Sequence, residues 1–105
     1  MSTHRYFICR GEEVLAHFLN ESSCAASATQ EIVEEMLGIT GTSMKTDLAD
    51  EGDDSLSAEY VVAKALAGRN GLQVTNGYVA EIAVWLDREA SRRADEFYVE
   101  GEENK

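Results

Sequence analysis

The sequence predicts a mostly α-helical single domain of four to five helices, to which a short strand near each terminus can be added. Three observations support this fold class. Apolar residues recur with a period of about 3.6 residues in four separate windows, proline is absent, and good helix formers such as alanine and glutamate are abundant. The length of 105 residues fits one domain with a modest core.

The first predicted element is a short strand. Residues 5–10, RYFICR, place four apolar residues between two arginines. The run is too short for a helix and is partly aromatic and β-branched, which favours a strand. A lone strand is unstable, and the similar run at residues 97–99 near the C-terminus could supply its partner.

Residues 11–19 and 22–37 are predicted as the first two helices, because each window carries its apolar residues on one helical face. Ser22 or Ser23 can cap the second helix, and Gly38 can end it. The apolar stripes consist of Val14, Leu15, Phe18 and Leu19 in the first window, and of Ala25, Ala28, Ile32, Val33, Met36 and Leu37 in the second.

The middle of the chain is predicted as a turn, a short helical segment over residues 43–48 and an exposed acidic loop over residues 47–54. The loop, DLADEGDD, holds five acids and one glycine. Ser55 or Ser57 can then cap a further helix that ends at Gly68.

The longest predicted element is a helix over residues 75–97, about six turns long, with Thr75 and Asn76 available as N-caps. An alternative interpretation makes residues 74–79 a hairpin around an Asn-Gly turn. The 3.6-residue period of the stripe that follows favours the helix. Residues 100–105, EGEENK, are predicted as a frayed acidic tail. The predicted core consists of Leu15, Phe18, Ile32, Val33, Met36, Val61, Leu66, Val79, Ile82 and Leu86.

No spacing of residues predicts an enzyme, a metal site or a cofactor. The possible zinc ligands His4, Cys9, His17 and Cys24 lack the close pairs of common zinc modules. The acidic loop fails as an EF-hand, because a loop that starts at Asp47 has Ala58 where calcium needs a glutamate. We therefore predict a non-enzymatic protein without a metal or cofactor.

The last two predicted helices are spaced as in a helix-turn-helix, a unit that can bind DNA directly. A recognition helix carries basic and amide residues at its N-terminal end. This one carries Tyr78 and Glu81 there, and its arginines Arg88, Arg92 and Arg93 lie in its second half. We expect no direct nucleic-acid binding from this unit.

Charge is the strongest compositional signal. Twenty Asp and Glu against nine Lys and Arg give a formal net charge of −11, which disfavours binding to nucleic acid or anionic membrane and favours basic protein surfaces. Between Glu31 and Glu59, nine acids against one base leave a local net charge of −8. The predicted partner-binding residues are Glu31, Glu34, Glu35, Asp47, Asp50, Glu51, Asp53 and Asp54.

The expected compartment is the cytoplasm. The chain shows no secretory signal and no apolar run long enough for a membrane span, so Cys9 and Cys24 are expected to be reduced. Two other interpretations of the surface stay open. The acidic face could simply be solvated, or the protein could be a regulatory or adaptor module that binds a partner through an apolar or aromatic patch that includes Tyr60, Tyr78 or Trp85.

The stretch Trp85-Leu86-Asp87-Arg88-Glu89-Ala90, followed by an acidic tail, is similar to the C-terminal helix of DNA-mimicking anti-CRISPR proteins of type I systems. The size, the charge and the lack of motifs also resemble small acidic proteins that phages make to block host defence. The resemblance implies an inhibitor that imitates nucleic acid, and it assigns no residue. Together with the charge, it predicts a non-enzymatic inhibitor that binds a basic nucleic-acid-binding surface of a host protein complex.

Overall fold

The computed structural model describes residues 3–46 and 56–103, with residues 97–103 described by their backbone. Its element order is β1 (His4–Arg10), β2 (Glu13–Asn20), α1 (Ser23–Leu37), β3 (Ser43–Thr46), α2 (Ala58–Asn70) and α3 (Asn76–Glu103). The strands form an antiparallel sheet in the order β2-β1-β3. The predicted mostly α fold of four to five helices is therefore wrong: the part of the chain described here is a small mixed α/β domain with three helices.

The first correction is a β-hairpin in place of a predicted helix. Arg10 pairs with Glu13, so residues 11–12 form a tight turn between β1 and β2. Gly11 has φ of 65°, a left-handed conformation that glycine adopts without a steric cost. Once residues 13–20 are extended, Ala16 and Phe18 lie opposite Ile8 and Tyr6 of β1, and this long-range pairing overrides the helical spacing of the apolar residues.

The second correction concerns the partners of β1. Residues 43–46, predicted as part of a helical segment, form β3, and Met44 lies opposite Ile8. Residues 97–99, predicted as a strand, continue α3 instead. Both edges of β1 are occupied by β2 and β3, so the N-terminal strand has no need of a C-terminal partner.

The helix starts agree with the predicted caps. The Ser22 hydroxyl accepts a hydrogen bond from the backbone N–H of Ala25 at 3.3 Å, and the Ser57 hydroxyl accepts one from Tyr60 at 3.3 Å. The Thr75 hydroxyl accepts one from the backbone N–H of Tyr78 at 3.1 Å. Helix α3 therefore begins where the alternative interpretation placed a hairpin, and that alternative is wrong.

The observed ends of the helices agree with the predicted ends in one case and differ in two. Gly38 ends α1 in the left-handed conformation, as predicted. Helix α2 continues through Gly68 and is ended by Gly71, which adopts the left-handed conformation with φ of 66°. Helix α3 extends to Glu103, so it includes residues 100–103 of the predicted tail.

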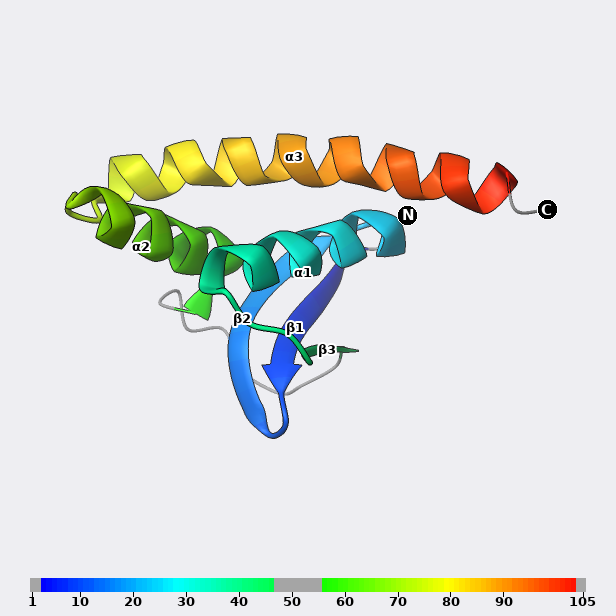
Figure 1. Ribbon diagram of the computed structural model, residues 1–105, viewed down its shortest axis with the longest axis horizontal. Coiled ribbons are helices and arrows are strands. Elements are labelled where there is room, and N and C mark those ends of the chain that lie inside the picture. The colour runs from blue at the N-terminus through cyan, green and yellow to red at the C-terminus, as the bar shows by residue number, and fades with distance from the viewer. Residues whose placement is uncertain (1–2, 47–55, 104–105) are drawn as a thin grey trace.

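The elements form layers. The sheet lies on one side, α1 and α2 cover it, and α3 lies across both helices, running opposite in direction to α1 (Figure 1). The core lies where these layers meet, and Ile8 from β1, Ile32 from α1, Val62 from α2 and Leu86 from α3 belong to it. One long helix thus contacts both other helices.

Most of the predicted core is correct. Phe18, Ile32, Val33, Ile82 and Leu86 are buried, and Met36, Val61, Leu66 and Val79 are half-buried against them. Leu15 is half-buried and lies outside this cluster. The prediction missed Ile8 and several alanines, including Ala16, Ala63 and Ala90, whose small side chains permit close approach of the elements.

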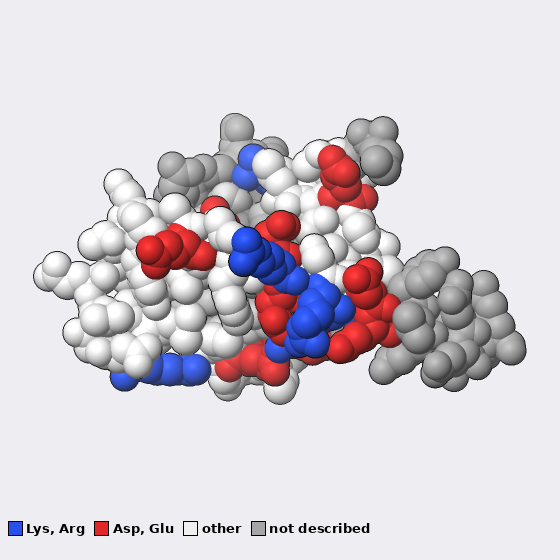
Figure 2. All heavy atoms as spheres, turned by 90° about the horizontal axis from the view of Figure 1, so that it is seen from above, with Lys and Arg blue, Asp and Glu red and all other residues white. Residues whose placement is uncertain are grey.

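In residues 3–46 and 56–96 the charged side chains all remain at least partly exposed, since the buried polar side chains there are those of His17 and Thr29. Seen from the α3 side, Lys and Arg side chains lie between groups of Asp and Glu (Figure 2). The acidic surface predicted from composition is therefore interrupted by cations along α3. No helix in the described ranges has the length and apolar character needed to cross a membrane.

Candidate functional site

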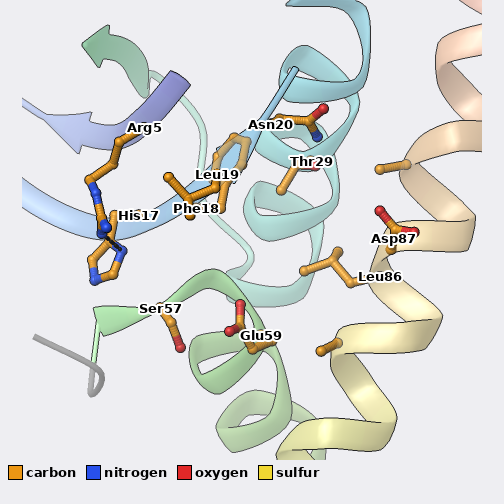
Figure 3. Close-up of a pocket in the computed structure, with 12 residues that line it drawn as sticks. Arg5, His17, Phe18, Leu19, Asn20, Thr29, Ser57, Glu59, Leu86 and Asp87 are labelled. Atoms are coloured by element: carbon orange, nitrogen blue, oxygen red, sulfur yellow. Dashed lines mark hydrogen bonds between the residues drawn. The ribbon is translucent and has the colours of Figure 1, made fainter. Parts of the chain in front are cut away.

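A surface cavity of about 390 Å³ opens beside β2, where the sheet meets the start of α2 and the middle of α3 (Figure 3). Phe18 and Leu86, both nearly buried, contribute apolar lining. Arg5 donates a hydrogen bond from Nη1 to Nδ1 of His17 at 3.2 Å on one side. Among the predicted acidic site residues that the structure describes, none lines this cavity.

The predicted acidic residues divide into two groups. Asp47, Asp50, Glu51, Asp53 and Asp54 lie outside the described residues. Glu31, Glu34 and Glu35 lie on α1, as predicted. The structure brings Glu31 and Glu35 together and directs Glu34 elsewhere, so the three acids of α1 do not act as one surface.

Glu34 stabilises the connection between α1 and β3. Its Oε2 accepts hydrogen bonds from the hydroxyl of Thr42 at 2.6 Å and from the backbone N–H of Thr42 at 3.3 Å. Gln30 donates to the same hydroxyl at 2.9 Å. Glu34 is half-buried by these contacts, and its carboxylate is less available to a partner than a count of acids suggests.

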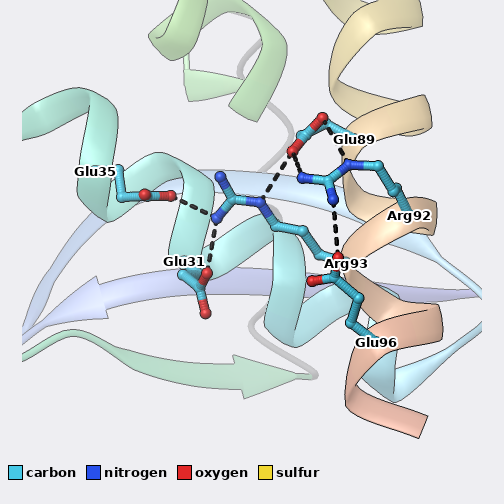
Figure 4. A network of polar contacts seen from close by, with 6 residues as sticks. All are labelled: Glu31, Glu35, Glu89, Arg92, Arg93 and Glu96. Carbon is cyan, nitrogen blue, oxygen red and sulfur yellow. Dashed lines mark hydrogen bonds and ion pairs between the residues drawn. The ribbon is translucent and has the colours of Figure 1, made fainter. Parts of the chain in front are cut away.

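Glu31 and Glu35 share one cation from α3, Arg93. We use the name acidic cluster for these residues and the neighbours of Arg93 on α3, which are Glu89, Arg92 and Glu96 (Figure 4). Arg93 donates from Nη1 to Oε1 of Glu31 at 2.7 Å and to Oε2 of Glu35 at 2.5 Å. Its Nε donates to Oε1 of Glu89 at 3.2 Å. A single guanidinium therefore joins α1 to α3 through three carboxylates.

Arg92 extends the cluster along α3. It pairs with Glu89 and, through Nη1, with Oε1 of Glu96 at 2.9 Å. The cluster as a whole holds four carboxylates and two guanidinium groups, which leaves a formal charge of −2. The acidic cluster therefore stays anionic after its internal pairing. Its members are Glu31, Glu35, Glu89, Arg92, Arg93 and Glu96.

The ion pairs shift the pKa values of three members of the cluster, Glu89, Arg92 and Arg93. Hydrogen bonds first from Arg92 and then from Arg93 hold the pKa of Glu89 below its ordinary value of 4.5. The hydrogen bond to Glu89 raises the pKa of Arg92, and the hydrogen bond to Glu35 is the largest cause of the raised pKa of Arg93. The ion pairs therefore favour the charged forms of Glu89, Arg92 and Arg93.

Sequence reasoning missed the contribution of α3 to this cluster. Charged residues of opposite sign at a spacing of three or four residues predict ion pairs along a helix. The sequence shows this spacing at Glu89, Arg92, Arg93 and Glu96, so these pairs could have been predicted. The contact of Arg93 with Glu31 spans 62 residues and depends on how α1 packs against α3. No local pattern indicates that contact.

The aromatic residues predicted for an adaptor surface differ in exposure. Tyr60 and Tyr78 are half-buried, and Tyr78 packs against the core. Trp85 is 38% exposed, and its neighbour Val84 is 53% exposed. Of the three predicted residues, Trp85 is therefore the one that offers the most surface to a partner.

The possible metal ligands do not meet. In residues 3–46 and 56–103, no three His, Cys, Asp or Glu side chains are placed to hold a metal ion. Cys9 is buried and Cys24 half-buried, and both are free thiols.

Comparisons with protein-family models, with curated proteins and with solved structures found no match to this chain.

Proposed function

We propose that the protein is a non-enzymatic inhibitor that acts in the cytoplasm by binding a basic nucleic-acid-binding surface of a host protein complex. The observation that carries this proposal is the net charge of −11 together with an exposed acidic cluster that stays at −2 after internal pairing. A groove that holds nucleic acid is lined with Lys and Arg, and a fixed anionic surface can compete for it.

The acidic cluster can accept a partner without losing its own ion pairs. The described contacts of Glu31 use Oε1 and those of Glu35 use Oε2, so the second oxygen of each carboxylate can accept hydrogen bonds from a partner. Both side chains are about half exposed, at 49% and 53%. Because Arg93 already orders them, binding costs less side-chain entropy than it would for free glutamates.

The resemblance of residues 85–90 to anti-CRISPR proteins suggests the first target class. CRISPR effectors hold guide and target strands in a positively charged channel. We therefore propose a type I effector complex as the first complex to test, with inhibition by exclusion of target DNA. Attraction between exposed charges is screened over about 8 Å at physiological salt, so binding should weaken steeply as salt rises.

The test is a gel-shift competition in which the protein displaces labelled target DNA from a purified type I effector complex. The Glu31→Gln, Glu35→Gln double variant removes two charges from the acidic cluster. The matched control, Glu12→Gln with Glu13→Gln, removes two charges from exposed positions at the hairpin turn. The cluster variant should compete several-fold more weakly than the control, since both carry the same net charge.

A second variant separates the contribution of the predicted acidic loop, residues 47–54, from that of the acidic cluster. Asp50→Asn, Asp53→Asn and Asp54→Asn together remove three predicted site charges without touching α1. If neither this variant nor the cluster variant competes less well than the hairpin control, or if displacement of DNA is insensitive to salt, the protein does not act through its acidic residues.

The exposure of Trp85 and Val84 favours one alternative, an adaptor that binds its partner by apolar contact. In that case Trp85→Ala should abolish capture of the partner while the two charge variants retain it. Salt should then strengthen or spare the interaction, which is the opposite of the effect expected for the inhibitor.

A further inference from the structure

The cavity beside β2 has a mixed lining, in which buried apolar side chains lie beside the buried polar side chains of His17 and Thr29 and beside charged residues. Phe18 and Leu86 are 9% and 6% exposed, so the apolar lining is fixed by the core. Arg5 and His17 lie on one side, Asp87 lies across from them, and Glu59 lies between at the start of α2 (Figure 3). Three layers of the fold thus meet around one opening.

The cavity carries two carboxylates, Glu59 and Asp87. In the described residues, neither Glu59 nor Asp87 makes an ion pair or a side-chain hydrogen bond, whereas Arg5 donates to His17. The charges around the cavity are therefore one engaged cation and two free anions. In a protein of net charge −11, such a cavity attracts a cation with an apolar body and repels an anion.

We propose that this cavity binds the side chain of an arginine presented by a protein partner. The aliphatic part of that side chain would pack on Phe18 and Leu86, and its guanidinium would bind Glu59 and Asp87. The inference deepens the proposed function and rests on it for the identity of the partner. A nucleic-acid-binding surface presents arginine side chains, which the cavity could then bind. The cavity volume of about 390 Å³ suits one side chain and its peptide groups.

Arginine fits better than lysine because the two carboxylates come from different helices. A guanidinium has five N–H donors in one plane and can bind two carboxylates at once, whereas an ammonium acts as a point charge. The molecule already shows this arrangement elsewhere on α3, where Arg93 binds carboxylates of α1 and α3 together. Asp87 and Glu89 are two residues apart, about 200° around the helix, so these two carboxylates point to different sides of α3.

The donors across the cavity suit the peptide groups of the same arginine. Asn20 uses its Oδ1 to accept from the backbone N–H of Ser22 at 3.2 Å, which leaves its amide N–H₂ to donate. Arg5 has guanidinium N–H groups beyond the one on His17. A peptide carbonyl of the partner can accept from either residue.

The experiment is an NMR titration of the ¹⁵N-labelled full chain at low salt. The probe is N-acetyl-arginine methylamide, and the matched probes are the lysine derivative and the neutral citrulline derivative. The arginine probe should shift the backbone amides of Phe18, Leu86 and Asp87 in a saturable way. Lysine should bind more weakly than arginine, and citrulline should produce no saturable shift.

The variant Glu59→Gln with Asp87→Asn should weaken arginine binding by about tenfold or more, the usual order for losing hydrogen bonds to charged groups. Neither carboxylate has an ion pair or side-chain hydrogen bond in the described residues, so the change should leave the fold intact. Glu59 lies in the first turn of α2, where the helix dipole favours an acid, so a small drop in melting temperature is expected. The control is Glu81→Gln, which removes an exposed charge from the same helix outside the cavity and should bind arginine like the parent protein.

Equal shifts with citrulline and arginine, equal losses in the control and cavity variants, or shifts remote from the cavity would each overturn the proposal. The Glu31→Gln, Glu35→Gln variant separates the arginine-binding proposal from the proposed function. It should bind the arginine probe like the parent protein, although it should compete less well with DNA. Saturable arginine binding in a protein that never displaces DNA would support the cavity and refute the inhibitor. DNA displacement without arginine binding would do the reverse.

Discussion

Helix α3 meets the rest of the molecule in two different ways. Its first part, up to Ala90, buries Ile82, Leu86 and Ala90 in the core. The part that follows contacts α1 at the surface through Arg93, which pairs with two glutamates of α1. Apolar burial contributes roughly 25 cal/mol per Å² removed from water, whereas an exposed ion pair contributes about 0–1 kcal/mol. The part of α3 up to Ala90 therefore fixes the fold. The part after it can present charged side chains to a partner at little cost in stability.

The largest effect expected from this difference is on Leu86. Replacing it by aspartate places an unpaired charge where the native side chain is 6% exposed, and we expect a loss of more than about 4 kcal/mol, enough to unfold much of a small domain. Circular dichroism with thermal melting measures it. The control is Leu72→Asp at a position 57% exposed, which should melt like the parent. Equal melting of both variants would show that α3 does not organise the core.

A smaller effect is expected where α3 meets α1 by ion pairs. Arg93→Gln leaves Glu31, Glu35 and Glu89 close together without their shared cation, so we expect a loss of about 1 kcal/mol that shrinks as salt rises. Urea unfolding at two salt concentrations measures it. Arg88→Gln provides the comparison, because Arg88 is exposed and forms no ion pair in the described residues. If the two variants lose equal stability, the cluster does not connect the helices.

The same contrast explains which parts of the fold were predictable. The starts of all three helices follow from side chains within a few residues of each start, since Ser22, Ser57 and Thr75 each accept a hydrogen bond from three residues further on. The stripe of α3 is also a local pattern, because its spacing is set by the helix itself. Such features can be derived from sequence without knowing the tertiary arrangement.

The hairpin could not be derived in this way. Phe7, Ile8 and Cys9 are buried one after another, so β1 shows no alternation of apolar and polar residues. In β2, apolar residues occur on both faces, and Val14, Leu15, Phe18 and Leu19 imitate a helical stripe. The register that makes this segment a strand depends on pairing with β1, a tertiary interaction.

The candidate site was predictable to a similar degree. Composition identified Glu31 and Glu35 as members of an acidic region, but not the cation that binds them. That cation, Arg93, follows from the antiparallel packing of α1 on α3 and lies 62 residues from Glu31. Glu34 was grouped with its neighbours by sequence, yet its contact with Thr42 gives it a structural role.

The smallest effect that we expect along α3 is a change in the stability of the fold at acidic pH, caused by Glu89. The pKa of Glu89 is held below its ordinary value of 4.5, by Arg92 first and then by Arg93. The folded state thus releases this proton more readily than the unfolded state, and the ionised carboxylate contributes stability at neutral pH. The contribution is complete above pH 4.5 and is lost as the pH falls through the depressed pKa.

The substitution Glu89→Gln removes this contribution at every pH. The parent should therefore melt above the variant at pH 7, and the difference should shrink as the pH is lowered through the carboxyl range. Thermal melts at a series of pH values measure this difference. Glu81→Gln is the control, because Glu81 is an exposed acid that forms no ion pair with the residues described by the structure. A difference that stays constant down to low pH would mean that the substitution acts through packing or helix propensity, and the charge of Glu89 would then contribute nothing to the contact between α1 and α3.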